Sequence, residues 1–175
     1  FIKEFRQYRD MQLTPLMIDN AFIDSIAYLQ YSDIKKMLNG ADLIRPAHIL
    51  VLLKQNATDA ERKLAKQKAD SIYNVIQGGA DFAEVAQKCS DDKGTARNGG
   101  LLPWIGPGNT IKEFEEAAYA LQQGQMCAPV LSPVGYHIIV MKERKSLENY
   151  ESIKDIIIDA LKQQGIEEAS AEERI

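Results

Sequence analysis

The sequence predicts an α+β fold in which helices surround an antiparallel sheet. Two apolar runs, residues 47–53 and 136–141, have the length of strands, and Pro133-Val134-Gly135 next to the second run indicates a hairpin turn. Between and around these runs, apolar residues recur at helical spacing. The predicted order is helices, then β-α-α-β-α-β-β, then a further helix, and this order favours the α+β class.

Residues 1–44 are predicted to form short helices. Residues that share a helical face occur in three groups, of which the first is broken by Pro15 and the third is stopped by Asn39-Gly40. The groups are Phe5, Tyr8 and Gln12; Phe22, Ile26 and Leu29; and Ile34, Met37 and Leu38, with Ser32 as the cap of the third. Such short helices bury little alone, so we expect them to pack on the rest of this chain or on a further segment.

From residue 45 the spacing of the apolar residues changes. The run at 47–53 is almost continuously apolar, which predicts a strand covered on both faces. Thr58 and Glu61 have the spacing of a capping box, and Gly78-Gly79 is a helix stop. Asp81 caps a second helix. The predicted buried stripes of these two helices are Ala65, Ala69, Ile72 and Ile76, then Phe82, Val85, Ala86 and Cys89.

Residues 90–109 are rich in Gly, Asp, Asn and Pro and are predicted to be a loop, interrupted by a short strand at 101–105. Thr110 and Glu113 have capping-box spacing, before a helix that buries Phe114, Ala117, Ala118 and Leu121 and stops at Gly124. A hairpin follows, with its second strand at 136–141. The last predicted helix carries Ile153, Ile156, Ile157, Ala160 and Leu161 and closes at Gly165.

Composition and charge exclude several functional classes. The 175 residues include 21 basic and 25 acidic ones, for a net charge of −4, and the basic residues do not form the cluster that nucleic acid requires. No stretch has the ~20 apolar residues of a membrane span. Cys89 and Cys127 lack metal-ligand spacing, so we expect no zinc site, and whether they pair is left open. The chain begins at Phe1, and we expect it to be part of a longer protein.

Both histidines of the chain, His48 and His137, lie inside apolar strand runs. One such histidine is usually a hydrogen-bonded core residue, but a buried imidazole needs a partner for each ring nitrogen. If the two strands are neighbours, each histidine can be the partner of the other, as a neutral pair with pKa values lowered by burial. A hydrolytic triad is the alternative, and it lacks support because no GxSxG elbow is present.

Three phrases carry a family resemblance: RPAHILV, CSDDKGTARNGGLLPW and FEEAAYALQQGQMCAPVLSPVGYHIIVMKER. In this order, from about Arg45 to Arg144, they resemble the successive signatures of the parvulin (PpiC, rotamase) family of peptidyl-prolyl cis/trans isomerases. The resemblance implies a four-stranded antiparallel sheet surrounded by helices. It places the isomerase domain at 45–145, a helical flank at 1–44 and a C-terminal helical extension at 146–175.

The resemblance also implies the site residues. The paired histidines fall on His48 and His137, the residue facing the substrate amide on Asp92, and the adjacent hydroxyl on Ser132. The proline-binding residues fall on Leu102, Phe114, Thr110 and Ile111. Two departures concern this pocket. Thr110 stands where relatives usually have Met, and Leu101-Leu102-Pro103 replaces their D-L-G.

By the same resemblance, isomerisation needs no nucleophile, metal or cofactor. The partners expected are unfolded or proline-containing polypeptides. Phosphoserine-proline specificity is not expected, because only Lys54 follows the first strand where phosphate-directed relatives have a basic cluster. The resemblance to exported folding factors of the SurA and PrsA types implies a periplasmic or cell-envelope location. The alternative function is a parvulin-fold chaperone module that binds unfolded chains with little or no catalysis.

Overall fold

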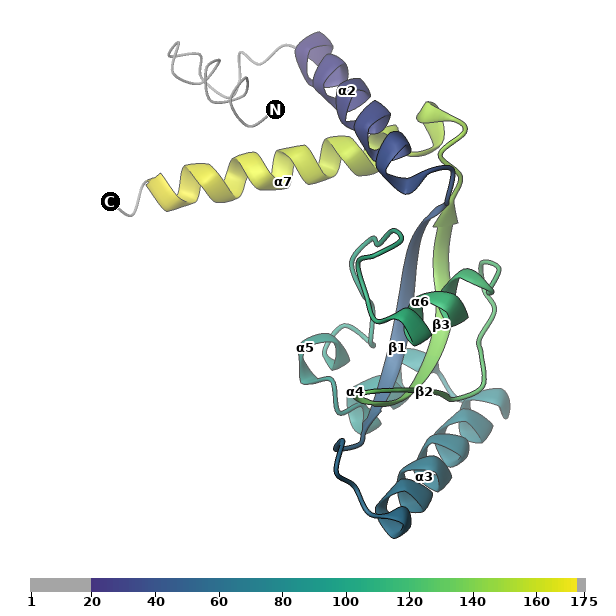
Figure 1. The fold of residues 1–175 in the computed structure, drawn as a ribbon. Coiled ribbons are helices and arrows are strands. Elements are labelled where there is room, and N and C mark those ends of the chain that lie inside the picture. Colours follow the sequence, from purple (N-terminus) through teal and green to yellow (C-terminus); the bar gives the residue numbers. More distant parts are fainter. Residues whose placement is uncertain (1–19, 173–175) are drawn as a thin grey trace. The chain divides into compact units, whose positions relative to one another are not determined.

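The structure, a computed structural model, describes residues 20–172, and the side chains of residues 24–163. The helical piece expected around Phe5 and Tyr8 lies outside this range. The chain divides into two compact units. One comprises Ala41–Ser146 and contains the sheet, and the other is formed by the two flanking segments (Figure 1).

The sheet has three strands and not the four implied by the resemblance. Strands β1 (Leu43–Leu52), β3 (Gly135–Lys145) and β2 (Val130–Ser132) lie in the order β1-β3-β2, and both pairs are antiparallel. The expected strand at 101–105 makes only two isolated bridges to β1, at Leu101 and Ile105. A continuous ladder is prevented because Pro46 and Pro103 have no N–H to donate.

The two faces of the sheet bury different residues. One face carries Ala47, Ile49, Val51 and Ile138 and packs on helices α3 (Asp59–Gln77) and α4 (Phe82–Cys89). The opposite face carries Ile44, Ile139 and Met141, which pack with Phe114 and Ala118 of α6 (Lys112–Tyr119). Successive strand residues point to opposite faces, so the nearly continuous apolar run of β1 supplies both cores. The prediction that this strand is covered on both faces is confirmed.

The helix starts show which capping predictions hold. Thr58 and Glu61 form the predicted capping box at α3, and Asp81 accepts from the N–H of Glu84 at α4. The capping box predicted at Thr110 is wrong, because the N-cap of α6 is Ile111 and α6 ends at Tyr119. A short helix, α5 (Lys93–Ala96), lies within the segment predicted to be loop.

The flanking unit contains α2 (Asn20–Leu38), the 3-10 turn η2 (Tyr150–Ser152) and α7 (Lys154–Glu172). Helix α2 is continuous where two pieces were predicted, and α7 passes through Gly165, the predicted stop. Packing of α2 against α7 buries Ile26, Ala27, Tyr31, Ile153 and Ile157. In contrast, Leu29 and Met37 of the predicted apolar stripes are exposed.

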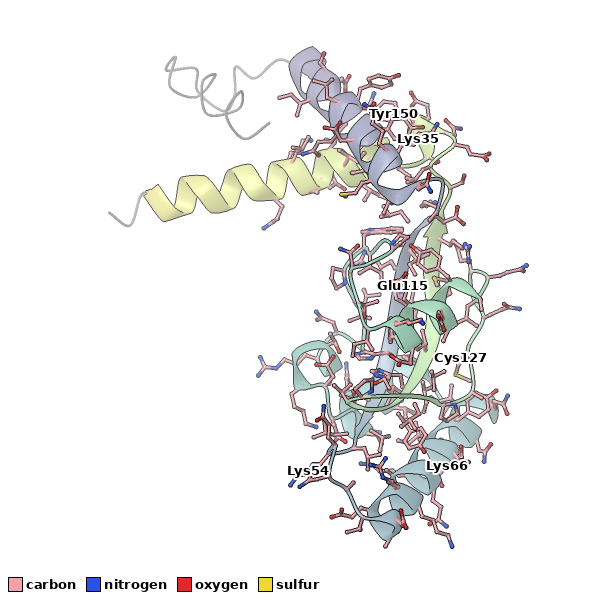
Figure 2. All side chains as sticks on the ribbon, viewed as in Figure 1. Lys35, Lys54, Lys66, Glu115, Cys127 and Tyr150 are labelled. Atoms are coloured by element: carbon pink, nitrogen blue, oxygen red, sulfur yellow. The ribbon has the colours of Figure 1, made fainter. Side chains whose placement is uncertain are left out.

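Two further contacts link the parts of this flanking unit. The hydroxyl of Tyr31 donates to the carbonyl of Leu147 over 2.6 Å, and Lys154 pairs with Asp24 at 3.4 Å. Tyr150 and Lys35 lie at the same end of the unit (Figure 2). There the ring of Tyr150 packs at a tilt on that of Tyr31, and the ammonium of Lys35 lies over the Tyr31 ring. Among the described helices, none has the length and apolar character needed to cross a membrane.

Candidate active site

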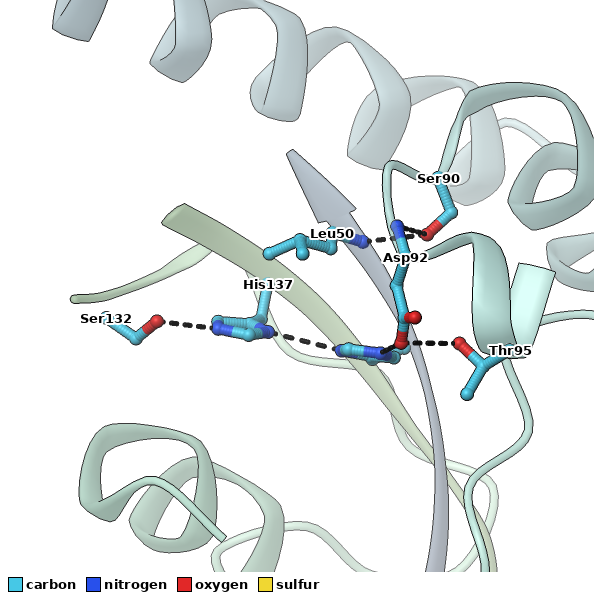
Figure 3. A network of polar contacts seen from close by, with 7 residues as sticks. Leu50, Ser90, Asp92, Thr95, Ser132 and His137 are labelled. Carbon is cyan, nitrogen blue, oxygen red and sulfur yellow. Dashed lines mark hydrogen bonds and ion pairs between the residues drawn. The ribbon is translucent and has the colours of Figure 1, made fainter. Parts of the chain in front are cut away.

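Five polar side chains form a continuous chain of hydrogen bonds on the α6 face of the sheet (Figure 3). Ser132 Oγ lies 2.7 Å from His137 Nε2, and His137 Nδ1 lies 3.2 Å from His48 Nδ1. His48 Nε2 lies 2.7 Å from Asp92 Oδ2, which also accepts from the Thr95 hydroxyl at 2.7 Å. Both histidines and Ser132 are buried, whereas the Asp92 side chain is 29% exposed. The chain of contacts therefore leads from the core to solvent at Asp92.

The network assigns a proton to each of its links. If Asp92 is ionised, it accepts the His48 Nε2 proton, and a neutral His48 then presents a bare Nδ1. His137 fills that acceptor with its Nδ1 proton, and its own Nε2 accepts from the hydroxyl of Ser132. In this arrangement every ring nitrogen has a partner. All these donors point in one direction, from Ser132 toward Asp92.

The pKa directions of His137 and Asp92 are clear. Burial lowers the pKa of His137 to about 4. The charge of neighbouring His48 acts in the same direction, and the charge of Asp92 acts against it. For Asp92 the largest single effect is burial, which raises the pKa. Hydrogen bonds from His48 and Thr95 together with the charge of His48 outweigh it, so the pKa is lowered overall. Near neutral pH the site therefore holds a neutral His137 and an ionised Asp92.

The segment after α4 is fixed to the edge of β1, and this brings Asp92 to His48. Ser90 is fully buried, and its Oγ accepts from the N–H of Leu50 at 3.1 Å and from that of Asp92 at 3.3 Å. The N–H of Asp91 donates to the carbonyl of Leu50 at 2.8 Å. Further along the same edge, the N–H of His48 donates to the carbonyl of Gly100. The loop thus covers the β1 edge that would otherwise be open.

Phe114 of α6 lies against both imidazoles. Its ring makes T-shaped contacts with His48 and His137, at centroid distances of 5.5 and 5.4 Å. The far end of α6 is held by Arg144 of β3. Its Nη1 donates to the carbonyl of Tyr119, the last residue of α6, at 2.9 Å and to that of Leu121 at 2.7 Å. A cation at a helix C-terminus is stabilising.

The family model described as the PPIC-type PPIase domain (rotamase) matches residues 48–143, more than half of the chain and all of the hydrogen-bonded site. The chain belongs to the PPIC-type PPIase family. Its relatives include the foldase protein PrsA of Geobacillus kaustophilus, 32% identical over 95% of this chain and 55% of the relative. The chain thus spans about half the length of that relative.

Two more comparisons agree with the family. The chaperone SurA of Alkalilimnicola ehrlichii is 35% identical over 71% of this chain and 29% of its own length. A crystal structure of the peptidylprolyl isomerase PrsA from Bacillus anthracis matches with a TM-score of 0.54 and 30% identity, over 82% of this chain and 61% of that one. The fold and the family therefore agree, although the solved protein extends beyond the matched part.

The predicted site residues of this PPIase domain lie in two groups. His48, Asp92, His137 and Ser132 are joined in the hydrogen-bond network. Leu102 and Ile111 pack, half-buried, against the apolar cluster of Phe114. Thr110 is half-buried and precedes this cluster in the chain without belonging to it. The functional roles of these residues stay predictions.

Two residues of the network were missed in the sequence. Thr95 lies three positions after Asp92, in the short helix that was predicted to be loop. Ser90 was assigned no role, although a serine directly after a helix and before two aspartates has the spacing of a turn that hydrogen-bonds its own backbone. That local signal could have indicated Ser90. Thr95 had a local signal as well, because it lies three positions after Asp92, the N-cap of α5.

We expect the stability of the PPIase domain to fall as the pH is lowered from about 6.5 to about 4. The pKa of His137 is lowered in the folded state, so its contribution is complete above the unfolded value of 6.5 and is lost as the unfolded chain gains the proton. The displacement corresponds to about 3 kcal/mol at most. Urea unfolding of wild type and His137→Asn between pH 7 and pH 4.5 measures it. If the free energy of unfolding falls with pH as steeply in the variant as in wild type, the assignment to His137 is contradicted.

Proposed function

We propose that this chain accelerates cis/trans rotation about X-Pro peptide bonds in polypeptides, as the isomerase part of an exported folding factor. The observation that carries the proposal is the network of two hydrogen-bonded histidines that ends at an ionised, partly exposed Asp92 beside the apolar Phe114 cluster. Membership of the PPIC-type PPIase family supports it.

The chemistry requires no covalent step. Resonance gives the amide C–N bond a rotation barrier of about 18–20 kcal/mol, and the uncatalysed X-Pro step takes tens of seconds or longer. The planar amide is more charge-separated than the twisted one, so an apolar contact around the proline ring favours the twisted state. Leu102, Ile111 and Phe114 would supply that contact.

Asp92 is the polar group placed to act on the amide. Its Oδ2 is bound by His48 and Thr95, and we assign the exposed part of this carboxylate to the substrate. The histidine pair holds the orientation of this carboxylate from beneath, and Ser132 fixes the tautomer of the pair. In this mechanism His48, His137 and Ser132 position Asp92, and Asp92 contacts the substrate.

A second candidate function, binding of unfolded chains without catalysis, is supported by the flanking unit. Helix α2 exposes Tyr28, Leu29 and Met37, with 56%, 51% and 77% of their surfaces accessible. We propose that residues 1–44 and 146–175 belong to a chaperone-like region that flanks the isomerase domain at 45–145. The relatives named foldase and chaperone support polypeptide clients and a cell-envelope location, the periplasm or the outer surface of a bacterium.

Exchange NMR on an Ala-Pro peptide series tests the proposed catalysis without a coupling protease. We expect the exchange cross-peaks of the cis and trans forms to grow with enzyme concentration, because the bound amide rotates faster than the free one. A well-folded protein that leaves the exchange rate at its uncatalysed value would contradict isomerisation and favour the second candidate. Measuring binding to an unfolded model protein in parallel separates the two functions.

A further inference from the structure

The short helix α5 begins at the aspartate of the candidate active site. Asp92 is its N-cap residue, but the carboxylate makes no capping hydrogen bond. Aspartate is among the most favoured N-cap residues, because its carboxylate accepts a backbone N–H of the first turn. Asp81 does so at the start of α4, where it accepts from the N–H of Glu84 at 3.1 Å. The carboxylate of Asp92 is thus diverted from the role that its position at a helix start would give it.

Thr95 binds the diverted carboxylate. It lies three positions after Asp92, the same spacing as that of Glu84 after Asp81. Its hydroxyl donates to Asp92 Oδ2 at 2.7 Å (Figure 3), while its N–H donates to the carbonyl oxygen of Asp92 at 3.3 Å. The same Oδ2 lies 2.7 Å from His48 Nε2. One oxygen of the carboxylate is therefore held by two side chains from different elements, α5 and β1.

The backbone of Thr95 is itself fixed to the strand that carries His48. Its carbonyl accepts from the N–H of Gly100 at 2.9 Å, and the carbonyl of Gly100 accepts from the N–H of His48 at 2.9 Å. These contacts form a closed ring, which runs from the His48 side chain through Asp92, Thr95 and Gly100 back to the His48 backbone. A hydroxyl held in such a ring fixes the rotamer of the carboxylate that it binds.

The other carboxylate oxygen, Asp92 Oδ1, lies beside Gly94. A Cβ at Gly94 would lie 3.4 Å from Oδ1, and apart from the neighbouring backbone it would have no other atom within 4 Å. The conformation of Gly94 does not require glycine, because it lies in α5 without a positive φ. What glycine provides at this position is open space next to Oδ1. The two oxygens therefore differ, because Oδ2 is held from two sides and Oδ1 borders open space.

We propose that Thr95 is a positioning residue of the isomerase reaction: with His48 it holds Oδ2 of Asp92, and it thereby turns Oδ1, beside Gly94, to the substrate. The inference rests on the proposed isomerase function and adds to it a residue and an orientation. Thr95 acts through Asp92 and does not contact the peptide. A carboxylate that is held in advance needs no reorganisation during the reaction, and a charged group contributes most to catalysis under this condition.

Two substitutions separate the hydroxyl of Thr95 from its shape. Thr95→Val removes the hydroxyl and keeps the branched side chain, whereas Thr95→Ser keeps the hydroxyl. For an Ala-Pro peptide at pH 7 we expect exchange NMR to show about a tenfold loss of kcat/KM in Thr95→Val and recovery of most of it in Thr95→Ser. The Kd of the peptide, from chemical-shift titration, should stay unchanged. The ¹⁵N signal of His48 Nε2 should move in the valine variant and return in the serine variant, because it reports on the partner of that nitrogen.

Two further variants serve as control and complement. Thr58→Val also removes a threonine hydroxyl at a helix start, but on α3, which packs on the opposite face of the sheet. It should lower the urea midpoint of unfolding and leave kcat/KM and the His48 signal unchanged. Gly94→Ala should lower kcat/KM about fivefold with the His48 signal in place, because its methyl group covers Oδ1 while the bonds to Oδ2 are kept.

The outcomes that overturn the inference differ from those that overturn the proposed function. Wild-type kcat/KM in Thr95→Val, a loss that Thr95→Ser does not recover, or an equal loss in Thr58→Val would remove Thr95 as a positioning residue. Wild-type kcat/KM in Gly94→Ala would overturn the assignment of Oδ1. If wild type accelerates no peptide, the proposed function fails, and the ¹⁵N signal of His48 then decides: the same signal in wild type and Thr95→Val would show that Thr95 does not hold the carboxylate.

Discussion

Replacing Asp92 with alanine is expected to lower kcat/KM for an Ala-Pro peptide by about 10²-fold. The substitution removes the ionised group that is assigned to the amide, and it leaves His48 Nε2 without its carboxylate partner. The fold should be retained, because Asp92 is partly exposed and water can replace the lost acceptor. Exchange NMR measures the loss of kcat/KM, and circular dichroism shows whether the fold is retained.

The controls for this prediction separate charge from shape. Asp92→Asn keeps the size of the side chain and removes its charge, so it should lose most of the activity if the charge matters. Asp70→Ala removes an exposed carboxylate that pairs with Lys66 on α3, and it should leave kcat/KM unchanged. Wild-type kinetics in Asp92→Ala would remove this residue from the mechanism and leave the apolar contacts as the source of catalysis.

Replacing Gly100 with alanine is expected to destabilise the isomerase domain by about 3 kcal/mol or more. Gly100 has φ +80°, and a Cβ there would lie 2.1 Å from the carbonyl oxygen of His48. The contact is with backbone, which cannot rotate away, and the backbone of His48 is itself bonded to Gly100. The clash between the new Cβ and the His48 carbonyl can be relieved only if the loop moves away from β1. Urea unfolding at pH 7 measures the loss.

Gly108 supplies a matched control for the backbone conformation. Its φ is +83°, close to that of Gly100, but a Cβ there would have no atom within 4 Å. Gly108→Ala therefore isolates the cost of a left-handed conformation for a side chain, about 1–2 kcal/mol. Equal destabilisation by the two substitutions would mean that the loop moves without cost, and that its contact with His48 does not hold the site together.

Much of the fold was readable from local patterns. The capping box at Thr58, the cap at Asp81 and the stop at Gly78-Gly79 depend on residues a few positions apart, and the structure has all three. The errors share a cause. Thr110 fits a capping box, but α6 begins at Lys112, and Glu115 in its first turn accepts instead from the N–H of Gly108. Local propensity gave way there to the closure of the preceding loop.

The sequence alone determined which residues have strand or helix character, and that His48 and His137 need polar partners inside apolar strands. A buried imidazole must satisfy both of its nitrogens, so the requirement is set by composition. Only the tertiary structure decided which partners these are. The register of β1 against β3 places the two Nδ1 atoms 3.2 Å apart, and the folding of a loop onto the β1 edge delivers Asp92. Both depend on contacts between residues more than forty positions apart, which no local pattern specifies.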